Sequence, residues 1–183
     1  AGLNELKNVA SIHIVAVENE VKELLWEIKK SFSDSPKIIA VNLEKQQIVS
    51  TSIELSKNYQ ATYSLPKKYL YEPNASLLKS GGFEAVSELF ALDKLHQHSH
   101  LYTADEIKDF QGRRFEITQE IPFQKNDLKK YIQNQKMNVT TRNFPLKVED
   151  IKKKYKISDG GTLFAFFTTN LKNEKIVLLC TKI

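Results

Sequence analysis

The fold of the first third of the chain is decided by Ser11-Ile-His-Ile-Val-Ala-Val17, a nearly continuous run of apolar, largely β-branched residues. Runs of this kind are typical of strands that are covered on both faces, as in a parallel sheet. Such a strand needs neighbours on both sides, and the flanking sequence supplies few. We therefore expect the sequence to begin in the middle of a domain, with residues 3–8 as the end of a helix.

The residues that follow this run predict the rest of an incomplete α/β sheet. Val21, Leu24, Leu25 and Ile28 recur at helical spacing, so residues 19–32 are predicted to form an amphipathic helix with Asn19 as its cap. Residues 37–43 and 47–55 predict two strands joined by a turn near residues 44–46. The order strand, helix, strand, hairpin, strand is the expected architecture of residues 1–68, which end in a polar linker at residues 56–68.

The pattern changes at residue 69, and residues 69–183 predict a second, mixed α+β domain. A helix is expected from Asn74 to about Phe90, interrupted at Gly81 and Gly82, and Thr103-Ala-Asp-Glu106 resembles a capping box before a short helix. Further helices are expected at residues 126–133 and 148–155. Strands are expected at residues 115–123, 137–142, 162–169 and 175–181, the last two forming a hairpin.

Composition and motifs exclude several classes of function. No apolar run approaches the roughly 18 residues that span a membrane, and no secretory leader is recognisable, so a cytoplasmic protein with no membrane partner is expected. The single cysteine, Cys180, lies in an apolar strand pattern that favours a buried, inert thiol. None of the common nucleotide-loop motifs occurs, and the chain has 6 glycines. His96, His98 and His100 alternate, which favours a polar loop or edge strand over a metal site.

The segment around Pro73 has two interpretations. Pro73 holds Glu72 in an extended conformation, and Asn74 can accept a hydrogen bond from the first turn of the following helix. Helix capping accounts for the segment without any chemistry. The functional alternative places Tyr71, Glu72 and Asn74 at the mouth of a site at the domain junction, where substituting Tyr71 or Glu72 would reduce turnover.

Positive charge is concentrated at the C-terminal end. Residues 123–183 carry 13 Lys and Arg against 5 Asp and Glu, whereas residues 69–122 carry 5 against 9. The charge by itself favours a lysine-rich solvated surface over a site for a polyanion. Clustered lysines supply salt-sensitive affinity for phosphates, and arginines add forked hydrogen bonds, so the basic cluster also supports nucleic-acid binding, although it identifies no target. The candidate RNA-binding residues are Arg113, Arg114, Lys125, Lys129, Lys130, Arg142, Lys152, Lys153 and Lys154.

Several segments together resemble one bacterial family. They are Val15-Ala-Val-Glu-Asn-Glu-Val-Lys-Glu-Leu-Leu25, Tyr69-Leu-Tyr-Glu-Pro-Asn-Ala75, His100-Leu-Tyr-Thr103, Asp109-Phe-Gln-Gly-Arg113 and Val139-Thr-Thr-Arg-Asn-Phe-Pro145. The family, frequent in Bacteroidetes, comprises class I S-adenosylmethionine-dependent methyltransferases that end in a THUMP-like domain. Gln111 departs from the proline that the family pattern has before Gly112.

The resemblance implies a division of labour. Residues 1–68 would be the end of a Rossmann-like catalytic sheet, and residues 69–183 the THUMP-like domain that captures tRNA or rRNA. The half of the enzyme that binds S-adenosylmethionine would precede this sequence and be its partner. No catalytic, cofactor-binding or metal-binding residue is then expected here, and the chain alone would be inactive. A structural role in bracing the catalytic half, or a place in a small-molecule methyltransferase, remain alternatives.

Overall fold

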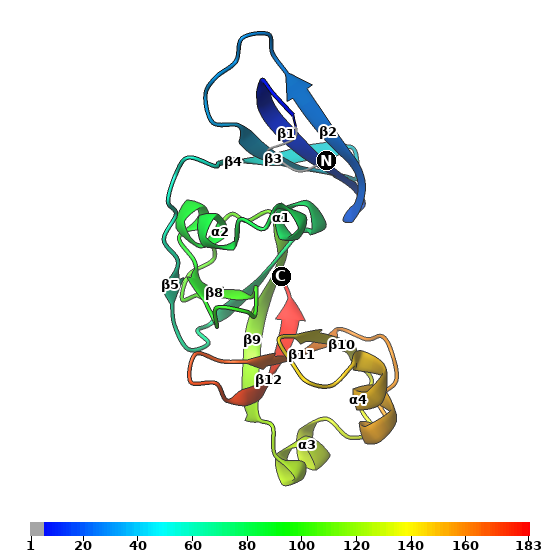
Figure 1. The fold of residues 1–183 in the computed structure, drawn as a ribbon. Helices are drawn as coiled ribbons and strands as arrows, with labels where there is room; N and C mark the ends of the chain where they lie inside the picture. Colours follow the sequence, from blue (N-terminus) through cyan, green and yellow to red (C-terminus); the bar gives the residue numbers. More distant parts are fainter. Residues whose placement is uncertain (1–5) are drawn as a thin grey trace. The chain divides into compact units, whose positions relative to one another are not determined.

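The computed structural model describes residues 6–183, which form two compact units that alternate along the chain (Figure 1). The first unit contains the residues up to Ala61 together with Pro73–Leu89, and the second contains Thr62–Glu72 and Phe90–Ile183. The sequence instead suggested one boundary, between residues 68 and 69. The helix end expected at residues 3–8 lies partly outside the described residues.

The first unit is built on a four-stranded sheet with the order β2-β1-β3-β4 (Figure 1). The strands are β1 (Val9–Val17), β2 (Glu20–Ile28), β3 (Lys37–Glu44) and β4 (Gln47–Glu54). β1 pairs antiparallel with β2 and parallel with β3, and β3 pairs antiparallel with β4. The apolar run at residues 11–17, which predicted a strand with neighbours on both sides, lies in β1 and has β2 and β3 as those neighbours.

The helix expected at residues 19–32 is wrong, because Glu20–Ile28 is strand β2. Glu18 and Asn19 have φ angles of 48° and 62°, the pair of left-handed residues that closes a two-residue hairpin with the twist that strands favour. Pairing with β1 then overrides the helical propensity of the glutamates, lysine and leucines. Asn19 is thus a turn residue and does not begin a helix of its own.

The two faces of this sheet differ in how they are covered. Helix α1 (Ala75–Ser80) contacts β1, β2 and β3, and the side chains of Ile12, Ile14 and Ile53 are buried. Gly82 precedes α2 (Phe83–Phe90), and a Cβ there would lie 2.6 Å from Ile53 Cδ1, so any larger residue would force the end of the Ile53 side chain to move.

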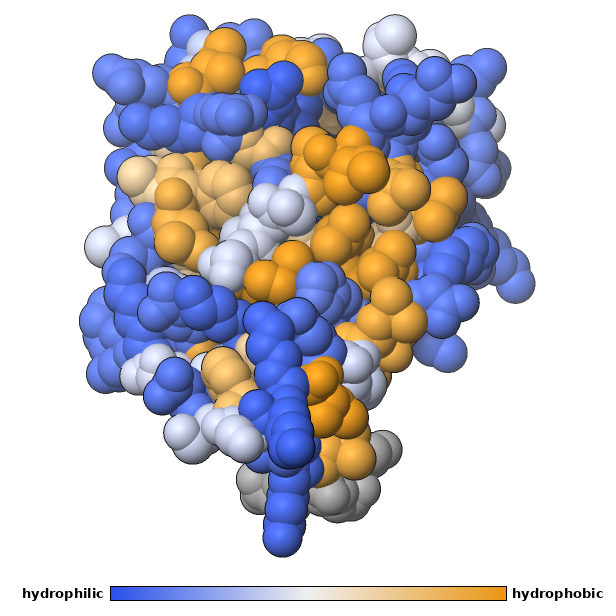
Figure 2. All heavy atoms as spheres, turned by 90° about the horizontal axis from the view of Figure 1, so that it is seen from above, coloured by the Kyte–Doolittle hydropathy of each residue, from blue (hydrophilic) through white to orange (hydrophobic). Residues whose placement is uncertain are grey.

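On the opposite face, the strand register brings together apolar side chains that are largely exposed. Leu25 of β2 is opposite His13 of β1, and Val17 of β1 is aligned through Leu43 with Ile48 of β4. The exposed fractions are 52% for Leu25, 39% for Val17 and 70% for Ile48. Figure 2 shows apolar side chains gathered across the middle of this view. We call this surface the open sheet face.

The second unit is built on an eight-stranded sheet with the order β10-β11-β12-β9-β6-β8-β7-β5. The strands are β5 (Thr62–Tyr63), β6 (Tyr69–Pro73), β7 (Asp93–Lys94), β8 (Tyr102–Ala104), β9 (Gly112–Pro122), β10 (Asn138–Arg142), β11 (Leu163–Thr169) and β12 (Lys175–Lys182). The helices are α3 (Lys125–Tyr131) and α4 (Val148–Tyr155). The hairpin of β11 and β12 and both basic helices confirm the sequence expectation.

Alternation along β11 and β12 gives this sheet an apolar core on each face. Phe166 and Leu178 pack with Leu70, Leu95 and other buried residues on one side. On the other side, a core that includes Phe167 packs against the residues that α3 and α4 bury. A sheet with two apolar faces fits the continuous apolar pattern of both strands.

The short helix expected after Thr103 is wrong, because Tyr102–Ala104 is strand β8 and residues 107–111 are not helical. β8 lies between β6 and β7, and Tyr102 and Thr103 are fully buried. Pairing of β8 with β6 and β7 thus overrides the capping-box pattern at residues 103–106. None of the helices in residues 6–183 is long and apolar enough to cross a lipid bilayer.

Candidate nucleic-acid interface

Two short amphipathic helices carry much of the positive charge of the second unit. α3 buries Leu128, with Ile132 just beyond its end, and α4 buries Ile151 and Tyr155, so each helix turns one apolar stripe toward the sheet. Residues four apart lie on the same face of a helix. The lysines between these anchors are consequently left at the surface.

A groove with a volume of about 490 Å³ lies where α3 and α4 meet. We call it the α3/α4 groove, and its lining residues are Phe123, Lys125, Leu128, Lys129, Gln133, Lys154 and Tyr155. Lys125 and Lys129 are one helical turn apart on α3, and Lys154 comes from α4. The structure thus brings together three of the nine basic residues that the sequence singled out.

The three groove lysines are available to an anionic ligand. Among residues 6–183, no carboxylate forms an ion pair with Lys125, Lys129 or Lys154. Lys154 Nζ lies 5.5 Å from the centre of the Tyr155 ring, an arrangement in which an aromatic face attracts a cation. Three ammonium groups around one concave surface create a local positive potential that attracts a polyanion.

The other lysines of these helices are placed differently. Lys152 forms an ion pair with Asp159 at 2.5 Å. Lys130 lies over the Tyr131 ring, 4.7 Å from its centre, and its hydrogen bond to the Tyr131 side chain raises the pKa of Lys130. Lys153 is exposed on α4 and does not line the groove. Lys130 and Lys153 therefore have the same charge as the groove lysines and lie on the same two helices, but they do not line the groove.

Arg113 and Arg142 are held by one buried carboxylate. The Glu72 side chain is 3% exposed and forms ion pairs with Arg113 and Arg142, whose side chains are 38% and 36% exposed. Arg113 Nε donates to Glu72 Oε2 at 2.6 Å, and Arg142 Nη2 donates to Glu72 Oε1 at 2.7 Å. The sequence assigned Glu72 to one candidate site and the two arginines to another. The structure makes them one ion triad that joins β6, β9 and β10.

Tyr71 and Asn74 also have structural partners. Tyr71 is fully buried, and its hydroxyl accepts a hydrogen bond from Lys108 N at 2.8 Å and donates one to Glu106 O at 2.9 Å. Burial raises the pKa of this hydroxyl. Asn74 Oδ1 accepts from Leu77 N at 3.0 Å, which confirms Asn74 as the cap of α1.

The alternating histidines lie between β7 and β8, not along one strand. His96 Nδ1 accepts from the backbone N–H of His98 at 3.1 Å, so the ring proton is on Nε2, which contacts Asn173 Oδ1 at 3.0 Å. Both ring nitrogens are thereby engaged. No group of three metal-ligating side chains is found in residues 6–183.

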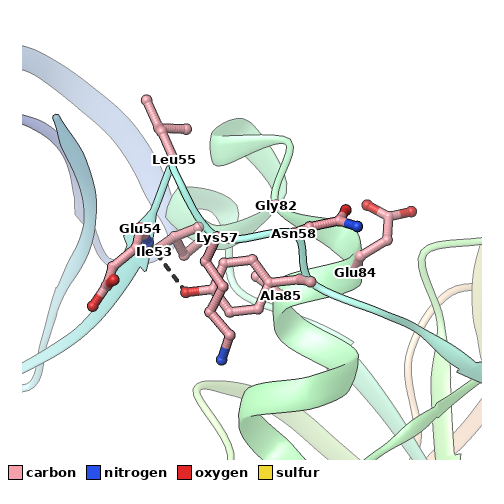
Figure 3. Close-up of a pocket in the computed structure, with 9 residues that line it drawn as sticks. Ile53, Glu54, Leu55, Lys57, Asn58, Gly82, Glu84 and Ala85 are labelled. Carbon is pink, nitrogen blue, oxygen red and sulfur yellow. Dashed lines mark hydrogen bonds between the residues drawn. The ribbon is translucent and has the colours of Figure 1, made fainter. Parts of the chain in front are cut away.

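A second hollow, of about 340 Å³, lies in the first unit between the end of β4 and the start of α2 (Figure 3). Glu54 and Glu84 are among its lining residues, and the Lys57 ammonium is paired with Glu88 at 2.7 Å. The two carboxylates disfavour an anion, so this hollow is the weaker candidate for a phosphate-bearing ligand.

Sequence reasoning missed the uncharged part of the α3/α4 groove. Phe123, Gln133 and Tyr155 line the groove but belong to no motif. The signal available was the spacing of Leu128, Ile132, Ile151 and Tyr155, which fixes the inward stripe of each helix. Phe115 and Phe144, which are close in sequence to Arg113, Arg114 and Arg142, pack against other phenylalanines, and the Arg113 guanidinium lies 5.6 Å from the centre of the Phe115 ring.

Two family models match separate parts of the chain. Residues 112–182 match a THUMP domain-like family, and residues 69–110 match a ferredoxin-like domain family. The chain is similar to a crystal structure described as a "putative methyltransferase" from Porphyromonas gingivalis W83, with 34% identity and a TM-score of 0.88. The similarity covers 98% of this chain and 47% of that one, so this chain spans about half the length of that protein. A comparison with curated protein sequences found no match.

Proposed function

We propose that this chain is the RNA-capturing part of a methyltransferase, and that the α3/α4 groove binds the phosphates of tRNA or rRNA. The observation that carries the proposal is the set of three lysines around one groove in the THUMP-like region, none of which is paired with a carboxylate of residues 6–183. The similarity to the Porphyromonas protein supports the methyltransferase part.

Within this proposal the chain binds and does not catalyse. The titratable groups at the groove are lysines and a tyrosine that anchors α4, which suits them to hold phosphates and gives no acid–base pair for methyl transfer. S-adenosylmethionine would be bound, in a class I Rossmann-like fold, by the part of the longer protein that this sequence lacks. The whole enzyme would work in the cytoplasm, where its RNA substrates are.

Salt dependence tests the proposal directly. Phosphate contacts release counterions, so the logarithm of the binding constant for single-stranded RNA should fall with the logarithm of salt, by about 0.7 per phosphate bound. Fluorescence anisotropy with labelled tRNA and rRNA fragments measures this. Absence of binding even at low salt would overturn the proposal.

The open sheet face favours a second role, the bracing of the remaining half of the longer protein. Soluble proteins seldom leave a contiguous apolar face uncovered, and the relative has roughly as much chain again outside the matched region. We propose that this face packs against that half. Alone, the chain should then bind a hydrophobic dye or self-associate, and Leu25→Lys with Ile48→Lys should abolish this without unfolding the chain. Sedimentation and dye fluorescence that do not change on double substitution would refute it.

A further inference from the structure

We infer that the α3/α4 groove receives an unstacked base of single-stranded RNA, while its lysines hold the flanking phosphates. This inference rests on the proposed function and narrows it, because it names the form of RNA that the site takes. A purely electrostatic surface would instead bind any RNA of equal charge.

The first argument is the chemistry of the groove floor. Phe123, Leu128 and Tyr155 form its apolar part, and these side chains come from two helices and the segment before α3. A site for phosphates alone needs no apolar floor, because phosphates remain hydrated and prefer polar donors. An aromatic and aliphatic surface beneath a basic rim is the combination that binds a base and its backbone together.

The second argument is the rigidity of that floor. The Phe123 ring is fixed by edge contacts with Phe144, whose centre is 4.9 Å away, and with Phe167, at 6.3 Å. Leu128 is 1% exposed and Tyr155 is 6% exposed, so both are anchored in the core, and the half-buried Phe123 ring is the part of the floor that a base can contact. A preformed pocket does not lose side-chain entropy when a ligand enters.

The third argument is the fit of size and polarity. A volume of about 490 Å³ falls within the range of small-molecule pockets and accommodates one nucleotide. Gln133 contributes a carboxamide that can both donate to and accept from the edge of a base. Bases in an A-form duplex are stacked and cannot enter such a pocket, whereas bases in loops and ends can be splayed out.

The test compares four labelled ligands with the whole chain: an oligouridylate of about 12 nucleotides, the same strand with abasic residues, a blunt duplex of equal charge, and heparin. The intact single strand should bind at least about tenfold more tightly than the abasic strand, since stacking contributes per base. The duplex should resemble the abasic strand.

Two variants separate the inference from the function on which it rests. Gln133→Trp should fill the groove and reduce the affinity for the intact strand to that for the abasic strand. Lys153 is on the same helix as Lys154 but outside the groove, so Lys153→Gln should leave the ratio of the affinities for the intact and abasic strands unchanged. Circular dichroism checks folding, and Gln133→Ala is the second variant if the tryptophan disturbs it. Equal affinity for intact and abasic strands overturns the inference but not RNA binding. No affinity for any RNA overturns both, and tighter binding of heparin than of every RNA leaves only a general polyanion surface.

Discussion

Glu72 and Arg142 are joined across the second unit by a hydrogen bond of 2.7 Å, although 70 residues separate them in the sequence. Arg113 holds the other carboxylate oxygen. A carboxylate that is 3% exposed needs such partners, because an unpaired buried charge is costly. We therefore interpret the triad first as a structural clamp on β6, β9 and β10.

The clamp predicts a coupled loss of stability. Arg113→Met or Arg142→Met alone should cost about 1–2 kcal/mol, because the other arginine still neutralises Glu72. The double variant should cost more than the sum, about 3–5 kcal/mol, because the buried carboxylate is then unpaired. Urea unfolding of the four proteins in this cycle measures the coupling.

A control shows whether the charge or the packing is responsible. Glu72→Gln added to the double variant should restore part of the lost stability, because the buried charge is removed while the shape is kept. Strict additivity of the two arginine substitutions would contradict the clamp.

The position of the lysines predicts unequal effects on RNA binding. Replacing Lys125, Lys129 and Lys154 by Gln should lower the salt slope for single-stranded RNA by about 2, given roughly 0.7 per phosphate contact. Replacing Lys130 and Lys153, on the same two helices, should change the salt slope by less than about half of the change that the three groove substitutions cause. Anisotropy titrations across a salt series measure both slopes, and equal effects would indicate a diffuse basic surface instead of a groove.

Residues with strong local patterns were predictable, and those that depend on partners were not. The helix cap at Asn74, the basic helices and the final hairpin follow from local signals, and each is present. Strand β2 was missed because its leucines and glutamates favour a helix until β1 offers an edge to pair with. The turn chemistry of Asn19 was the overlooked signal.

The candidate site shows the same limit. Lysine positions could be assigned from charge, but not which of them share a groove, because that depends on how α3 and α4 pack. Glu72, Arg113 and Arg142 are far apart in the sequence and meet through the order of the strands. The pairing that occupies these arginines could not be inferred from a single sequence.

Asn19 has two separable roles that predict a graded series. Its φ of 62° favours glycine or asparagine, and its Oδ1 accepts from Ala75 N at 2.7 Å at the start of α1. Asn19→Gly keeps the turn and loses the hydrogen bond, at a cost of about 0.5–1.5 kcal/mol. Asn19→Ala loses both and should cost about 1–2 kcal/mol more. Denaturant unfolding ranks the three proteins, and an alanine variant as stable as the glycine variant would contradict the strained turn.

Cys180 predicts a pH dependence. It is fully buried in β12, and burial raises the pKa of its thiol because the thiolate would be desolvated. The folded state keeps the proton, whereas the unfolded chain releases it above about pH 8.5. The free energy of unfolding should therefore fall as the pH rises through that value, at a rate of about 1.4 kcal/mol per pH unit for this group. Cys180→Ala should lower the free energy of unfolding at pH 7, but the variant lacks the loss of stability that the thiol causes at high pH. The difference in free energy of unfolding between the wild-type protein and the variant should therefore narrow as the pH rises. A stability difference that stays constant between pH 7 and 10 would show that the thiol is not desolvated.

A second measurement tests the burial of Cys180 directly. A thiol reagent should modify the native protein no faster than the protein unfolds, and rapid modification of the folded protein would show that the thiol is accessible.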